Sequence, residues 1–224
     1  MVVSIETEIG LEIEVEVDVS RVGKYSNEPD PLACIANECK AQLLIPSPDT
    51  FPSGSVLHEL LHIQRFLVEG VPQIAVCENR WCPELESVFT HLDNNLEHLV
   101  VVPRELAQRP ERKDRWVGVM TRALTQLQSV NIETADRDFL AIYGRFFVEH
   151  VLGDEDLLKK YTAALHSYNL SDRATEFSLA TAMSLPFKEA TVRVWVEQFH
   201  LSREFLCLDY FDPRKGTCHQ HQLS

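Results

Sequence analysis

Two histidines four residues apart, His58 and His62, lie in a segment with helical composition, and this spacing constrains the fold more than any other feature. Residues i and i+4 project from one face of a helix, so both imidazoles can approach one metal ion at about 2.0–2.1 Å. Glu59 lies on the flank of that face, within reach of a metal-bound water. A metal lowers the pKa of such a water, and a nearby carboxylate can accept its proton. The segment therefore predicts a metal site on a helix.

The same three side chains can also be explained as ordinary interior residues, because short patterns of this kind arise by chance. Leu57, Leu60 and Leu61 give the segment apolar faces that anchor it in a core. Burying two imidazoles and a carboxylate for packing alone is unfavourable, since each loses its hydration. We therefore expect a metal site rather than structural histidines.

The sequence His58-Glu59-Leu60-Leu61-His62 resembles the His-Glu-x-x-His signature of the zincin metallopeptidases. The resemblance implies an α+β, zincin-like fold with Zn2+ as cofactor and a peptide or protein as substrate. It implies hydrolysis by a metal-activated water, with Glu59 as general base. Two alternatives remain: a catalytically idle zincin-fold protein that binds a protein partner, and a hydrolase of non-peptide amides. Fold analogy does not choose among them.

Zincins use a third protein ligand, and its identity divides their subclasses. The metzincin pattern needs a glycine and a histidine where this chain has Arg65 and Val68, so that subclass is excluded. The glutamate-type zincins take a Glu from the next helix. Spacing favours Glu84 or Glu86, whereas a polar cluster inside an apolar segment favours Glu97. We expect Glu97 as the third ligand, with Glu86 as the alternative.

Polar residues near Glu97 are candidates for supporting roles. His98 or His91 can donate a hydrogen bond to the oxyanion of the reaction, which makes His98 a candidate catalytic residue. Asp93, one turn before Glu97, can orient a ligand imidazole. Each is equally compatible with an ordinary surface or core position.

The pattern of the chain predicts one domain over residues 1–224, mainly β over 1–50, with metal-binding helices over 55–102 and a mainly helical remainder. Apolar and acidic residues alternate from Ile5 to Val19, which predicts a strand or a hairpin bent near Gly10. Turn signals predict a loop over 21–33. A short strand is expected at 41–46 and another at 205–208, before a flexible tail containing Cys218-His219-Gln220-His221. Helices are expected at 56–68, 83–100 (closed by Pro103), 114–128, 134–151, 154–167, 171–184 and 188–200.

Charge and cysteine content narrow the partners and the location. The net charge of -13 and pI near 5.1 argue against nucleic acid and against anionic membrane surfaces as partners. The sequence shows neither a membrane-spanning segment nor signal-peptide features, so we expect a cytoplasmic location. The six cysteines should then be reduced and inert, because Cys34/Cys39 and Cys77/Cys82 lack zinc-knuckle spacing. The oligomeric state is left open.

Overall fold

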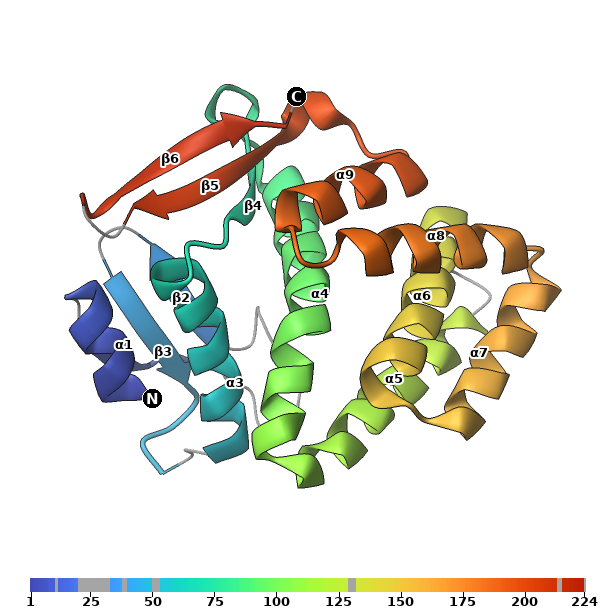
Figure 1. Cartoon of the computed structure of the whole chain (residues 1–224), viewed down its shortest axis with the longest axis horizontal. Helices are drawn as coiled ribbons and strands as arrows, with labels where there is room; N and C mark the ends of the chain where they lie inside the picture. Colours follow the sequence, from blue (N-terminus) through green and yellow to red (C-terminus); the bar gives the residue numbers. More distant parts are fainter. Residues whose placement is uncertain are drawn as a thin grey trace. The chain divides into compact units, whose positions relative to one another are not determined.

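The computed structural model divides the chain into two compact units, Met1–Arg109 with Glu204–Ser224, and Pro110–Arg203 (Figure 1). It describes residues 1–10, 12–19, 33–37, 40–49, 53–128, 132–212 and 215–223. The α+β class expected from the sequence is confirmed, with small three-stranded sheets and a large helical content. The C-terminal strands belong to the first unit together with the N-terminal half of the chain. Among the described helices, none has the length and apolar content needed to span a membrane.

The first sheet has the strand order β1-β3-β2 and contains β1 (Ile13–Val17), β2 (Ala33–Asn37) and β3 (Lys40–Ile45). β3 is parallel to β1 and antiparallel to β2, so β2 is an edge strand. The predicted strand at 41–46 is confirmed as β3, whose residues from Ala41 to Ile45 are buried. Most of the loop predicted over 21–33 lies outside the described residues, but Ala33 already belongs to β2.

The N-terminal segment corrects the expected strand or hairpin, because Val2–Ile9 forms helix α1. Gly10 ends this helix in the left-handed region (φ 67°), and its N–H donates to the Glu6 carbonyl at 2.9 Å. Ile5 joins the core against the first sheet. The alternating pattern is a strand only from Ile13, and Val15 on it is 52% exposed, so the expected apolar face is largely uncovered.

The motif lies on α3 (Ser53–Ile63), which continues as a π-helical segment, η1 (Gln64–Val68). This confirms the helix expected at 56–68. Leu60, Ile63 and Phe66 pack in one apolar cluster with residues of β3. Because this face of α3 is buried against β3, the orientation of the helix is fixed. Its opposite face contacts the next long helix.

That helix is α4 (Pro83–Gln108), and Figure 1 shows it beside α3. We expected it to end before Pro103, but it runs through the proline to Gln108. A proline inside a helix removes one hydrogen bond to the carbonyl four residues earlier. Val101, Val102 and Glu105 are fully buried, so tertiary packing outweighs that loss. The longer helix brings Glu105 into the same element as His98.

A second sheet, ordered β4-β5-β6, joins β4 (Gln73–Val76) to β5 (Leu206–Asp212) and β6 (Thr217–Gln222). The segment at 205–208 is a strand, as expected, but the tail after it is not flexible: Cys218–His221 belongs to β6. A disulfide joins Cys77 to Cys207, which corrects the expectation of reduced, inert cysteines. The two residues are 130 apart in sequence, and only the pairing of β4 with β5 brings their Cα atoms to 5.2 Å.

The second unit is helical, and each helix expected there is confirmed within a few residues. Its elements are α5 (Lys113–Leu127), α6 (Thr134–Phe147), the π-helical η4 (Val148–Leu152), α7 (Glu155–Ser167), α8 (Ser171–Ser184) and α9 (Lys188–Gln198). Short 3-10 turns occur at η2 (Glu78–Arg80), η3 (Pro110–Arg112) and η5 (Arg203–Phe205). Aromatic rings contribute much of its core, and the Trp195 ring contacts both Tyr143 and Phe177.

Gly144 marks the closest approach between α6 and α7. A Cβ at this position would lie 2.2 Å from Tyr161 Cε1, far inside van der Waals contact. Tyr161 is fully buried, and its hydroxyl donates to the Met120 carbonyl at 2.8 Å. The ring therefore has little room to move.

Gly144→Ala should lower the free energy of unfolding by about 1–3 kcal/mol, because the added methyl group displaces the Tyr161 ring. Gly118→Ala is the matched control in α5, where the new Cβ would lie 3.7 Å from Arg122 Nη1. That change should stabilise the helix by about 0.5–1 kcal/mol. Urea denaturation of both variants measures the difference, and a Gly144→Ala chain as stable as the wild type would contradict this packing.

Candidate metal centre

Three imidazoles converge between α3 and α4. His62 Nε2 lies 3.1 Å from His58 Nε2, which lies 3.2 Å from His98 Nε2. The ligand nitrogens of all three are within 4.8 Å of one another. Among the described residues, these three form a group of His, Cys, Asp or Glu side chains close enough to share an ion. His58 is buried, whereas His62 and His98 are half-buried, so part of the cluster is exposed to solvent.

The spacing of these nitrogen atoms fits a metal. A tetrahedral site with zinc–nitrogen bonds of about 2.0–2.1 Å separates its ligand atoms by about 3.3–3.4 Å. Two of the three nitrogen pairs are close to that value. Neutral imidazoles facing one another through unprotonated nitrogens repel, whereas a shared cation is coordinated by those same lone pairs. The donor set therefore suits a borderline-soft ion such as Zn2+.

Glu105 completes the geometry around His58. Its Oε2 lies 3.1 Å from His58 Nδ1, and the Glu105 side chain is fully buried. A carboxylate in this position accepts a hydrogen bond from the Nδ1–H group, and this tautomer leaves the lone pair that a metal needs on Nε2. Glu105 was not among the expected site residues, since the helix was expected to stop at Pro103. Had the helix been expected to continue through the proline, Glu105 would have been placed two turns after His98.

Glu59 lies on α3 with its carboxylate against Cys34 of β2, where the Cys34 thiol hydrogen-bonds to it. Burial raises the pKa of the Cys34 thiol well above its ordinary value, and the negative charge of Glu59 raises it further. The thiol therefore stays protonated and serves as a hydrogen-bond donor to the carboxylate. Glu59 is half-buried, so part of it remains in contact with solvent.

The structure does not bring Glu97 into this cluster, which corrects the expected third ligand. Arg65 Nε donates to Glu97 Oε2, and Arg65 Nη2 donates to Oε1 at 3.2 Å. Within the described residues, it is the neighbouring His98 whose side chain lies with His58 and His62. Successive helix residues point about 100° apart, so only one of the two neighbours can face His58. The polar cluster identified the correct turn of α4 but not the correct residue.

Glu86, the alternative ligand, is also distant from the imidazoles. It is exposed in the first turn of α4, and twelve helical residues separate it from His98, or about 18 Å. Asp93 Oδ1 accepts a hydrogen bond from the Ile74 N–H at 2.8 Å and so ties β4 to α4. His91 contacts the Ser87 carbonyl at the exposed surface of α4.

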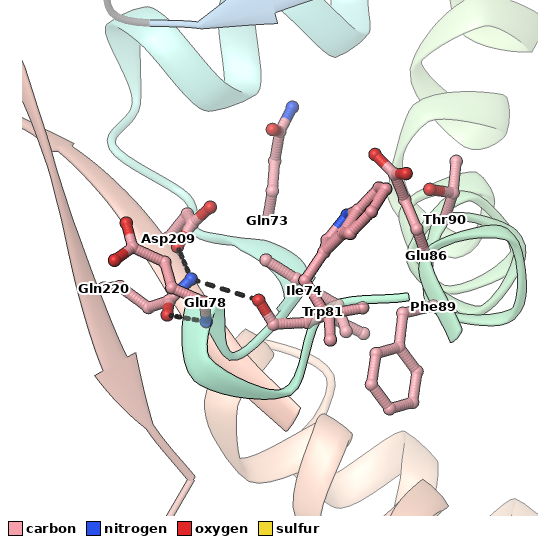
Figure 2. Close-up of a pocket in the computed structure, with 11 residues that line it drawn as sticks. Gln73, Ile74, Glu78, Trp81, Glu86, Phe89, Thr90, Asp209 and Gln220 are labelled. Atoms are coloured by element: carbon pink, nitrogen blue, oxygen red, sulfur yellow. Dashed lines mark hydrogen bonds between the residues drawn. The ribbon is translucent and has the colours of Figure 1, made fainter. Parts of the chain in front are cut away.

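Glu86 instead lines a separate pocket of about 540 Å3 beside β4 (Figure 2). Trp81 and Phe89 contribute aromatic rings to its lining, and Asp209 and Glu78 contribute carboxylates. Gln220 links the two sides: its Nε2 donates to Asp209 Oδ1 at 3.0 Å, and its Oε1 accepts from the Glu78 N–H at 3.0 Å. These hydrogen bonds support the turn after β4, and none of them involves the three imidazoles.

No family model matches the chain, and comparisons with curated proteins and with solved structures also find no match. The interpretation of the metal centre therefore depends on its own geometry.

His98→Ala should abolish high-affinity zinc binding, because two imidazoles alone leave the ion without its third protein ligand. Glu86→Gln is the matched control in the same helix and should bind zinc as the wild type does. Titration of the metal-free chain with zinc against a chromophoric chelator measures both affinities. Unchanged affinity in His98→Ala would contradict the three-histidine site.

Asp209→Asn should increase stability at neutral pH. Burial raises the pKa of Asp209 above 3.8 and the Glu78 charge raises it further, while the Gln220 hydrogen bond opposes both. The folded state therefore holds this proton more tightly than the unfolded state. The carboxyl favours folding fully below its unfolded pKa, and this contribution is lost as the pH rises through the folded pKa.

The advantage of Asp209→Asn over the wild type should accordingly grow between pH ~3.5 and ~7. Urea denaturation across this range measures it. Asp156→Asn, a change at an exposed carboxylate in α7, serves as the control and should show a smaller pH-dependent difference. A difference for Asp209→Asn that shrinks with rising pH would contradict the raised pKa.

Proposed function

We propose that this chain is a zinc-dependent metallohydrolase that cleaves an amide bond of a peptide or protein, with His58, His62 and His98 as the ligands. The convergence of three Nε2 atoms is the observation that carries the proposal. Three protein ligands leave a fourth position of a tetrahedral zinc site for water, as in catalytic rather than structural sites. The buried carboxylate of Glu105 supports the same assignment, since outer partners of this kind hold metal-binding imidazoles.

Glu59 is the proposed general base. When bound, zinc supplies a water of lowered pKa and polarises the carbonyl of the substrate. Glu59 accepts a proton as the water oxygen attacks the carbonyl carbon. It then donates this proton to the amide nitrogen as the carbon–nitrogen bond breaks. The Cys34 thiol holds the carboxylate on the side of β2, while Glu105 keeps His58 in its Nδ1–H tautomer.

The edge strand β2 supports a peptide as substrate. Among the strands that the structure describes, it pairs with β3 alone, and its Cys34 contacts Glu59. In an antiparallel ladder, every second residue of an edge strand directs its N–H and C=O away from its partner. An extended peptide can hydrogen-bond to these groups and so place its own backbone beside the base. We include in this proposal that the edge strand β2 and the motif helix α3 are arranged as in the zincins.

Glu59→Gln should retain zinc but lose peptide cleavage by about 10²- to 10⁴-fold, because the amide cannot accept the proton of the attacking water. Zinc content by atomic absorption and cleavage of a mixture of fluorescence-quenched peptides measure the two properties. Glu86→Gln, a change at an exposed acidic residue in the first turn of α4, should retain measurable cleavage.

The wild type decides between hydrolase and idle binding protein. Zinc together with cleavage that depends on Glu59 supports the hydrolase. Stoichiometric zinc without cleavage of any peptide would favour the catalytically idle alternative, and absence of zinc affinity would remove both.

A further inference from the structure

A buried ion pair lies directly beside the three imidazoles. Arg65 follows His62 by three residues at the start of η1, and Glu97 precedes His98 by one residue on α4. Their side chains are 8% and 7% exposed, so both charges are removed from solvent. The pair therefore joins the two segments that carry the imidazoles, next to the point where those imidazoles meet.

The contact is a fork rather than a single bond. Arg65 uses both Nε and Nη2 to reach the two oxygens of Glu97, with Nη2 to Oε1 at 3.2 Å. A planar guanidinium that holds both oxygens of a carboxylate restrains direction as well as distance. Arg65 Nη1 also lies 3.6 Å from Glu69 Oε2, and Arg104 Nη2 donates to the same oxygen at 3.1 Å. These four charges connect η1 to α4 at two places.

Stability alone gives a weak reason for such a pair. The desolvation of two buried charges offsets most of their attraction, and apolar residues of similar size often replace a buried pair without loss of stability. A pair of this kind does specify geometry, because it is satisfied only in one arrangement of its two helices. The arrangement specified here is that of α3 with η1 against α4.

We infer that the Arg65–Glu97 pair positions His98 for metal binding by fixing the rotation of α4 about its own axis. Adjacent helix residues point about 100° apart, so holding Glu97 toward Arg65 directs His98 toward His58. Glu105, two turns further along the same helix, reaches His58 from the same rotation. This inference depends on the proposed metal centre and assigns Arg65 and Glu97 as positioning residues of it.

The test replaces both charges together, since single changes leave one charge buried and can unfold the chain. Arg65→Met combined with Glu97→Leu should keep a thermal midpoint at or above that of the metal-free wild type. Its zinc affinity should be about 10- to 100-fold weaker, as found when outer partners of metal ligands are removed. The Co2+ absorption spectrum of the variant should also differ from that of the wild type, because the imidazoles no longer share one geometry.

Two further variants make the readout specific. Arg65→Lys keeps the charge but not the fork, so its zinc affinity should lie between those of the wild type and the double variant. Arg173→Met breaks the ion pair with Asp138 in the second unit, where Nη1 and Oδ2 are 3.0 Å apart, and should leave zinc affinity unchanged.

Each outcome bears on the inference. A double variant with wild-type zinc affinity and cobalt spectrum would overturn it and leave the metal centre intact. An equal loss of affinity in Arg173→Met would also overturn it, since the effect would not be local. A wild-type chain without zinc affinity would overturn the metal centre and the inference together.

Discussion

The contact between α3 and α4 is the constraint on which the candidate site depends. Each helix contributes what the other lacks: α3 supplies two imidazoles and Glu59, and α4 supplies His98 and the buried Glu105. An isolated helix with two histidines has a weak metal site, because the remaining coordination positions are filled by water. In the packed pair, His58 is buried while His62 and His98 are half-buried. The convergence of the imidazoles and their exposure are therefore both consequences of how these helices meet.

The surrounding sheets hold this contact in place from two directions. Apolar residues of α3 and η1 pack on the first sheet, with Leu60 and Ile63 in the same cluster as Leu43. The second sheet is tied to α4 through the hydrogen bond from the Ile74 N–H to Asp93, and its own strands are cross-linked by Cys77 and Cys207. The polar and charged residues of the site thus rest on an apolar framework, as buried polar groups require. Disulfides are typical of oxidising environments, so this cross-link does not support the expectation of reduced cysteines.

Near the imidazoles, two adjacent residues of one helical turn have different partners. Glu97 and His98 are neighbours in sequence, but their side chains diverge, one into an ion pair with Arg65 and the other toward His58. A carboxylate beside a buried guanidinium already has its negative charge compensated. The imidazole of the histidine at the next position can offer a lone pair in its neutral form. Glutamate is a common metal ligand, but here the arginine already binds its carboxylate.

The sequence by itself determined the motif helix, the helices of the second unit, the strand at β3, and the pairing of His58 with His62, because helical periodicity and i, i+4 spacing are local properties. It misread Val2–Ile9, since alternation over a few residues does not reveal a helix capped by Gly10. Only the tertiary structure decided that His98 joins the cluster, that Glu105 supports it, and that Cys77 meets Cys207. These depend on contacts between residues 40 or more apart in sequence, which no local pattern encodes. The rotation of α4, set by burial and by Arg65, selected one residue of the polar turn over its neighbour.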